Sequence, residues 1–313
     1  MIRLFGTVLL IIIGFSSPAL ASRPPTVLAS IKPVAMLIKA VAGDELTVNV
    51  LLPTNVSPHE YTLKFSDLRA IKRAALVVWV GPELEGVLVK VLRNIPSTNV
   101  VQLTQLKNMR WPKSLDAKPH EGRGHHGHDS DGPENQVQDE RDNSYNRDPH
   151  LWLNPQNSLL AVEAIKTALI NQYPERQTLF EENAQAFSEK ISVLNQSISK
   201  DLEHVRATGF IVVHDGYGHF VDHYNLNQLA AIQLTGGAHR GARHYSEIIA
   251  LGDKVACIYT EPQLNNKAAL QLAGKLGANH AELDIMGSNI PLSKNSYVEF
   301  ISSFAETFRA CLD

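Results

Sequence analysis

The chain has 313 residues, of which 44% are hydrophobic, and a formal net charge of −3. This length is sufficient for two domains of ordinary size, each with a buried core. The near-neutral charge argues against nucleic-acid binding, which would select a strongly basic face.

The N-terminal sequence MIRLFGTVLLIIIGFSSPALAS has the organisation of a secretory signal peptide. Arg3 precedes an apolar run from Leu4 to Phe15, and the small residues ALA-S follow, so we predict a signal peptide over residues 1–21 with cleavage after Ala21. The alternative is a membrane anchor, but the run is shorter than the ~20 residues that span a bilayer. The mature protein is therefore expected to be exported and soluble.

Strand patterns alternate with helical patterns along the rest of the chain. In the first half, strands are predicted at Thr26–Ile31, Leu46–Leu52, Ala75–Val80 and Asn99–Leu103, and helices at Val34–Ala42, Ser66–Ala74 (with Ser66 as N-cap) and Leu84–Leu92. In the second half, strands are predicted at Gly209–His214, Gln228–Leu234, Ala256–Glu261 and His280–Asp284, with helices between them and a closing helix at Val298–Leu312. Such alternation is typical of α/β proteins with parallel sheets, and it predicts one α/β domain at 22–173 and a second at 207–313.

A polar segment interrupts the first domain. Residues 118–146 show no apolar period, so this segment is expected to be a disordered loop. It contains a group of histidines that can bind metal weakly as an auxiliary site: His120, His125, His126 and His128. The alternative is a solvated linker whose histidines have no role.

A long helix is predicted between the two domains, over about residues 174–206. Apolar residues recur there at steps of three and four, namely Phe180, Ala184, Phe187, Ile191, Leu194, Ile198 and Leu202. A helix from Pro174 to His204 would be ~45 Å long, which suits a rigid connection between two domains. The alternative is a core helix of one large domain.

The two cysteines are predicted to form a disulfide bond. Cys257 lies in a predicted strand and Cys311 in the closing helix. In an oxidising compartment the only two cysteines are expected to pair, which would join that strand to that helix. The alternative is two free buried thiols.

Four ionisable residues lie at or beyond the ends of predicted strands: His59, His150, His214 and Asp284. Ligands of α/β sheets bind beyond the carboxyl ends of the strands, so these groups can converge if the two halves face each other across a cleft. Neutral imidazole and carboxylate are ligands that Zn²⁺ prefers. Asp148 and Asp215 are candidates for orienting the rings of their histidine neighbours.

Other histidines compete with this set. His219 and His223 lie four residues apart in HFVDH, but a metalloprotease requires HExxH, and position 220 is Phe. We interpret that pair as structural. His239 and His244 lie on a glycine-rich segment near the expected cleft and are candidates for auxiliary residues.

Several motifs, in chain order, carry a resemblance that covers the whole mature chain: SPHEYTLKFSDLRAIKRAALVVWVGPELE, DPHLWLNP, IVVHDGYGHF, YTEPQL and LDIMGSNI. The chain resembles the periplasmic zinc-binding subunits of bacterial high-affinity zinc uptake ABC transporters. The resemblance implies two α/β domains joined by a long helix, with one Zn²⁺ ion in the interdomain cleft. The motifs of the family match His59, His150 and His214 as ligands, with Asp284, Glu60 or water as the fourth.

Two departures from the family pattern adjoin the cleft. LDIMG replaces the usual Asp-Pro-Leu-Gly, and TGGAHRGAR is an unusual form of its loop. The resemblance further implies a monomeric periplasmic protein, without enzymatic activity, that delivers Zn²⁺ to an inner-membrane ABC permease with a cytoplasmic ATPase. The histidine-rich loop at the mouth of the cleft would collect zinc loosely and pass it to the cleft, or report zinc abundance.

Two other functions stay open. A manganese carrier or adhesin of the same superfamily would use harder oxygen ligands, whereas nitrogen at His214 favours zinc. A zinc hydrolase would require an open coordination position and a general base, for which Glu60 is the candidate.

Overall fold

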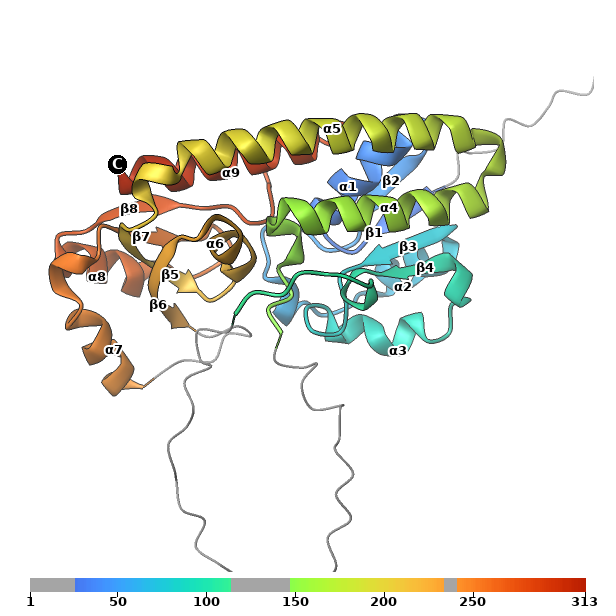
Figure 1. Cartoon of the computed structure of the whole chain (residues 1–313). Coiled ribbons are helices and arrows are strands. Elements are labelled where there is room, and N and C mark those ends of the chain that lie inside the picture. The colour runs from blue at the N-terminus through green and yellow to red at the C-terminus, as the bar shows by residue number, and fades with distance from the viewer. Residues whose placement is uncertain (1–25, 114–146, 234–240) are drawn as a thin grey trace, which may run out of the picture.

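The computed structural model (Figure 1) describes residues 26–113, 147–233 and 241–313. The predicted signal peptide, the segment at 118–146 with its four histidines, and His239 lie outside the described residues. Within the described part of the chain, no helix is both long enough and apolar enough to cross a membrane.

The first half forms a four-stranded parallel sheet, as predicted. Its strands are β1 (Thr26–Ala29), β2 (Thr47–Val50), β3 (Leu76–Trp79) and β4 (Val100–Gln102). They are arranged in the order β2-β1-β3-β4. The helices between these strands are α1 (Lys32–Ala42), α2 (Phe65–Arg73) and α3 (Val89–Leu92).

The second half repeats the same arrangement. Its strands are β5 (Gly209–His214), β6 (Asn227–Gln233), β7 (Cys257–Thr260) and β8 (Asn279–Glu282), in the order β6-β5-β7-β8. Its helices are α6 (Gly218–Tyr224), α7 (Ala242–Ile249), α8 (Lys267–Leu276) and α9 (Ser296–Leu312). All eight predicted strands are confirmed, with ends that differ by a few residues at most.

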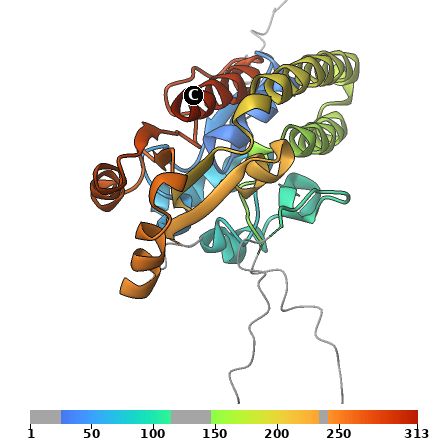
Figure 2. The same ribbon diagram turned by 60° about the vertical axis from the view of Figure 1, so that its left-hand side comes forward.

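The long helix is confirmed as α5 (Gln177–Asp201), with short 3-10 turns at Pro174–Arg176 and Glu203–Val205 on either side. It packs on α1 and α4 (Pro155–Gln172) of the first half and on α9 of the second half. Figure 1 shows α5 lying across both halves, and the turned view in Figure 2 shows α5 and α9 side by side. Its buried residues follow the predicted stripe, so one apolar face is shared between the two halves.

One local prediction was wrong, and one helix had not been predicted. Helix α2 begins at Phe65, so Ser66 lies inside its first turn; the carboxylate of Asp67 instead accepts a hydrogen bond from the backbone N–H of Lys64 at 2.8 Å. Helix α4, over 155–172, is the one that no sequence pattern had predicted. Asn154 caps that helix, because its side-chain oxygen accepts from the backbone N–H of Gln156 at 2.8 Å.

The predicted disulfide bond is confirmed. Cys257 of β7 is bonded to Cys311 of α9, with the two Cα atoms 5.9 Å apart. The bond closes a segment of 54 residues within the second half. It fixes the last helix, which also packs on α5, to the sheet.

Candidate metal centre

Three histidines meet between the two halves. His59 lies on a short turn (Pro58–Glu60) beyond β2, His150 directly precedes a turn at Leu151–Leu153, and His214 is the last residue of β5. Their ring centroids are separated by 5.5 Å (His59–His150), 5.9 Å (His59–His214) and 4.9 Å (His150–His214). One ligand atom from each ring lies within 4.8 Å of the other two. The structure thus brings together the three histidines that the sequence analysis singled out.

The free nitrogens of these rings share one property. The Nε2 atoms of His59, His150 and His214 are buried and have no hydrogen-bond partner among the described residues. All three side chains line a cavity of about 290 Å³. Three imidazole nitrogens around a tetrahedral Zn²⁺ at 2.0–2.1 Å would lie about 3.4 Å apart. The cluster therefore fits such an ion with small movements of the rings.

A carboxylate orients the ring of His150. Asp148 accepts from the Nδ1–H of His150 at 2.6 Å and from the His150 backbone N–H at 3.0 Å. Burial raises the pKa of Asp148, but the charge of His150 and the hydrogen bond to it outweigh burial and lower it overall. An ionised Asp148 holds the proton on Nδ1 and leaves Nε2 free as a ligand. The predicted role of Asp148 is confirmed.

A different carboxylate orients His214 from the one predicted. The His214 Nδ1–H donates to Glu261 Oε1 at 3.1 Å, and the hydroxyl of Tyr217 donates to the same oxygen at 3.0 Å. The prediction of Asp215 was wrong, since its carboxylate accepts instead from Gln228 at 3.1 Å. Glu261 follows β7, the strand next to β5. Its position at the end of a predicted strand, in the motif TEP, could have indicated this role.

The electrostatics of His214 and His59 differ. Burial lowers the pKa of His214, but the charge of Glu261 and its hydrogen bond outweigh burial and raise the pKa overall. For His59, burial and then the proximity of His150 and His214 lower the pKa to about 3. The ring of His59 is therefore neutral, as a metal ligand must be.

Two glycines make room for the cluster. A Cβ atom on Gly216 would lie 2.5 Å from Cε1 of His214 and 2.9 Å from Cε1 of His150. A Cβ atom on Gly218 would lie 2.8 Å from Oδ2 of Asp148. The glycines of HDGYG are therefore required by the crowding of the rings and Asp148, a role that the motif alone does not show.

The two candidate carboxylates for a fourth ligand are not part of the three-histidine group. Asp284 accepts at Oδ1 from the backbone N–H of Met286 and at Oδ2 from that of Ser288, at 3.0 and 2.5 Å. Glu60 lines the cavity but is exposed to solvent.

The competing histidines have other partners. His219 is buried and its Nε2–H donates to the backbone oxygen of Asp148 at 2.8 Å, while His223 contacts Asn195 at 2.7 Å. The structural interpretation of this pair is therefore supported. His244 donates to the backbone oxygen of Ala231 at 2.8 Å.

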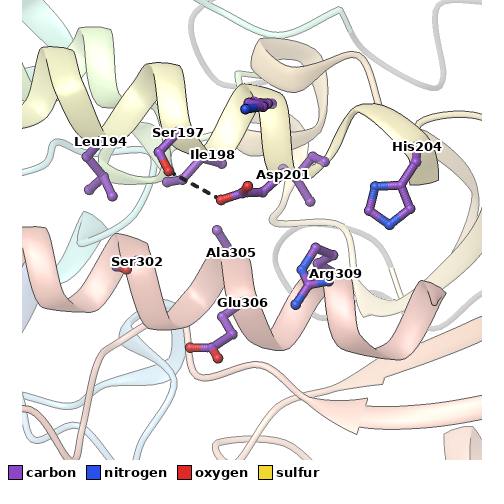
Figure 3. A pocket seen from close by; sticks show the side chains of 11 residues that line it. Leu194, Ser197, Ile198, Asp201, His204, Ser302, Ala305, Glu306 and Arg309 are labelled. Atoms are coloured by element: carbon purple, nitrogen blue, oxygen red, sulfur yellow. Dashed lines mark hydrogen bonds between the residues drawn. The ribbon is translucent and has the colours of Figure 1, made fainter.

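A larger cavity, of about 540 Å³, lies between the C-terminal parts of α5 and α9. Figure 3 shows it lined by side chains of both helices, among them Ser197 and Asp201 of α5 and Glu306 and Arg309 of α9. Ser197 donates to Asp201 at 3.3 Å, and Arg309 is paired with Asp313 at 2.7 Å. Among the described residues, its side chains form no group of three metal ligands.

The fold and the cluster together define a class: a two-domain α/β protein that can hold one metal ion between its halves. The chain belongs to the family described as zinc-uptake complex component A, periplasmic, whose model matches residues 27–311. It is similar to the high-affinity zinc uptake system proteins ZnuA of Yersinia pestis (31% identity, covering 91% of each chain) and Haemophilus ducreyi (33% identity, covering 91% of this chain and 93% of the other). A crystal structure of ZnuA superposes with a TM-score of 0.71 at 21% identity, covering 91% of this chain and 99% of the other.

Proposed function

We propose that this protein captures Zn²⁺ in the periplasm through His59, His150 and His214 and delivers it to an inner-membrane ABC permease driven by a cytoplasmic ATPase. The observation that carries the proposal is the convergence of three buried imidazole nitrogens that have no hydrogen-bond partner in the described part of the chain. A set of three nitrogen donors favours a borderline cation such as Zn²⁺ over Mn²⁺, which prefers oxygen. Membership of the zinc-uptake family supports the same cargo.

The binding half of this proposal is tested by titration of the mature protein against a competing chelator. We expect one tight Zn²⁺ site per chain, and a loss of affinity of about a hundredfold in His214→Ala, because each ligand contributes a share of a large binding free energy. His204→Ala is a matched control, since His204 is largely exposed and pairs with Asp313. Equal affinities of wild type and His214→Ala would overturn the assignment.

The delivery half is tested in cells. A strain that lacks its own periplasmic zinc-binding component should regain growth in chelator-containing medium with the wild-type gene but not with the His214→Ala gene. If the strain that carries the wild-type gene grows only when manganese is added, the result would instead favour a manganese carrier. Metal-dependent hydrolysis by the purified protein would favour the hydrolase alternative.

Export and domain division are parts of the same proposal. Cleavage after Ala21 would release a mature, monomeric chain with domains at 22–173 and 207–313 and a connecting helix at 174–206. The N-terminal sequence and mass of the secreted protein test the first point. Gel filtration with light scattering tests the monomer.

A further inference from the structure

Gln263 lies in the loop after β7 and lines the same cavity as the three histidines. Its amide nitrogen donates two hydrogen bonds, to the backbone oxygen of Thr54 at 2.9 Å and to Oδ1 of Asp284 at 3.0 Å. Because an amide has only two N–H donors, both are used, and the orientation of the amide is fixed. Thr54 belongs to the first half and Asp284 to the second, so this side chain connects the two halves beside the site.

The amide oxygen of Gln263 has no such partner. Nine buried polar side-chain atoms of the described residues lack a hydrogen bond, and four of them belong to residues that line this cavity. These four are Nε2 of His59, Nε2 of His150, Nε2 of His214 and Oε1 of Gln263. A buried acceptor without a partner is costly unless a ligand completes it. The cavity therefore offers three imidazole nitrogens that can bind a metal ion, and one neutral oxygen that can accept a hydrogen bond.

The carboxylate of Asp284 is already engaged. Its two oxygens together accept from two backbone N–H groups and from the amide of Gln263. Asp284 also does not line the cavity. The hydrogen bond from Gln263 thus helps to hold the half-buried carboxylate of Asp284 in a position outside the cluster.

We propose that Gln263 is a positioning and specificity-determining residue of the metal site. Its Oε1 accepts a hydrogen bond from the water that occupies the fourth position on the bound ion, and its Nε2 keeps Asp284 from becoming a ligand. The fourth position is then neutral, which favours Zn²⁺ and disfavours Mn²⁺, an ion that prefers carboxylate oxygen. This inference rests on the proposed binding of Zn²⁺ by the three histidines.

Two substitutions separate the roles of the amide. Gln263→Met keeps the length of the side chain but has neither a strong acceptor nor a donor, and we expect Zn²⁺ affinity to fall about tenfold. The visible spectrum of the Co²⁺-loaded protein should change, because the fourth ligand loses its support. Gln263→Glu supplies an anionic oxygen, and Mn²⁺ affinity should rise about tenfold.

Gln228→Met is the matched control. Gln228 is another amide of the second half whose buried Oε1 lacks a partner among the described residues, but it does not line the cavity. Gln228→Met should leave the Co²⁺ spectrum unchanged. Thermal unfolding of each apoprotein confirms folding, and Gln263→Glu continues the test if Gln263→Met does not fold.

The outcomes separate this inference from the function on which it rests. If His214→Ala abolishes tight binding while a folded Gln263→Met keeps both the wild-type affinity and the Co²⁺ spectrum, the role of Gln263 is overturned and the function stands. If Asp284→Asn changes the Co²⁺ spectrum and Gln263→Met does not, the role of Gln263 is also overturned, because Asp284 would then be the ligand. If His214→Ala binds as tightly as wild type, the function itself fails.

Discussion

The two faces of the metal cavity are built differently, although the two sheets have the same strand order. On the second-half face, His214 ends a fully buried strand and its ring is held by Glu261 at the end of the neighbouring strand. On the first-half face, His59 lies on a short turn beyond β2, and no hydrogen bond joins its ring to a carboxylate of the described residues. The sheet itself positions one face, whereas loops position the other.

His150 is intermediate between these cases. Its supporting carboxylate, Asp148, is two residues away in the same loop, and that loop is held in turn by His219 of α6. Orientation by a neighbouring strand depends on the whole second half being folded. Orientation by a local carboxylate depends only on a short segment.

Loss of the disulfide bond is expected to give the largest difference in stability between the two halves, because the bond lies only in the second half. Replacing both Cys257 and Cys311 with Ser should lower the free energy of unfolding by about 4 kcal/mol, from the loop entropy of the 54-residue separation. Hydrogen exchange should show the loss of protection in β7 and α9 first. Equal loss in β1 and β3 would contradict a second half that is stabilised separately.

Crowding at Gly216 gives the next largest effect. Gly216→Ala would push a methyl group against the rings of His214 and His150, so Zn²⁺ affinity should fall about a hundredfold as two ligands are displaced. Chelator competition measures this change. Gly241→Ala is the control, because a Cβ atom there meets no neighbour within 4 Å among the described residues.

The two faces should respond to acid with opposite signs in the metal-free protein. The pKa of His59 is lowered to about 3 in the folded state, so the unfolded state binds the proton first and stability is lost as the pH falls from about 6.5 towards 3. The pKa of His214 is raised, so its contribution is present below about 6.5 and is lost as the pH rises through the folded pKa.

Denaturant unfolding at pH 7 and pH 5 isolates the contribution of His59. Wild type should lose about 2 kcal/mol more than His59→Gln between these values, if the folded pKa is near 3. An identical pH dependence in both proteins would show that His59 titrates normally in the folded state.

Replacing the carboxylate that supports the His214 ring should weaken Zn²⁺ binding less than removing the ring itself. Glu261→Gln should weaken Zn²⁺ binding about tenfold, since the neutral amide oxygen is a weaker acceptor than the carboxylate and holds the proton on Nδ1 less firmly. Asp148→Asn should act similarly on His150. If Glu261→Gln has no effect while Asp148→Asn does, the sheet alone positions His214.

Deletion of residues 118–146 should have the smallest effect on the tight site. The three clustered histidines, and the carboxylates that hold His150 and His214, lie outside that segment, so we expect less than about a twofold change in the tight affinity, with loss of weaker sites only. Calorimetric titration distinguishes the two kinds of site. Loss of the tight site on deletion would contradict the assignment to the cavity.

The sequence by itself determined the strands, the long helix, the disulfide bond and the identity of the three histidines. Alternation of strand and helix periods is a local property, so each strand could be recognised from its own residues. The same holds for the apolar stripe of α5. The pairing of the cysteines could be predicted because the chain has only two. The three histidines could be recognised because each lies in a short contiguous motif.

Only the tertiary structure decided which carboxylates support the rings and which do not. Asp215 follows His214 in the chain, but it lies just beyond the end of β5 and its carboxylate accepts from Gln228, so the neighbour in sequence was the wrong candidate. Glu261 is 47 residues away and becomes a neighbour because β7 pairs with β5. In the same way, backbone N–H groups and Gln263 determine the position of Asp284, and no pattern in the sequence shows where those donors point.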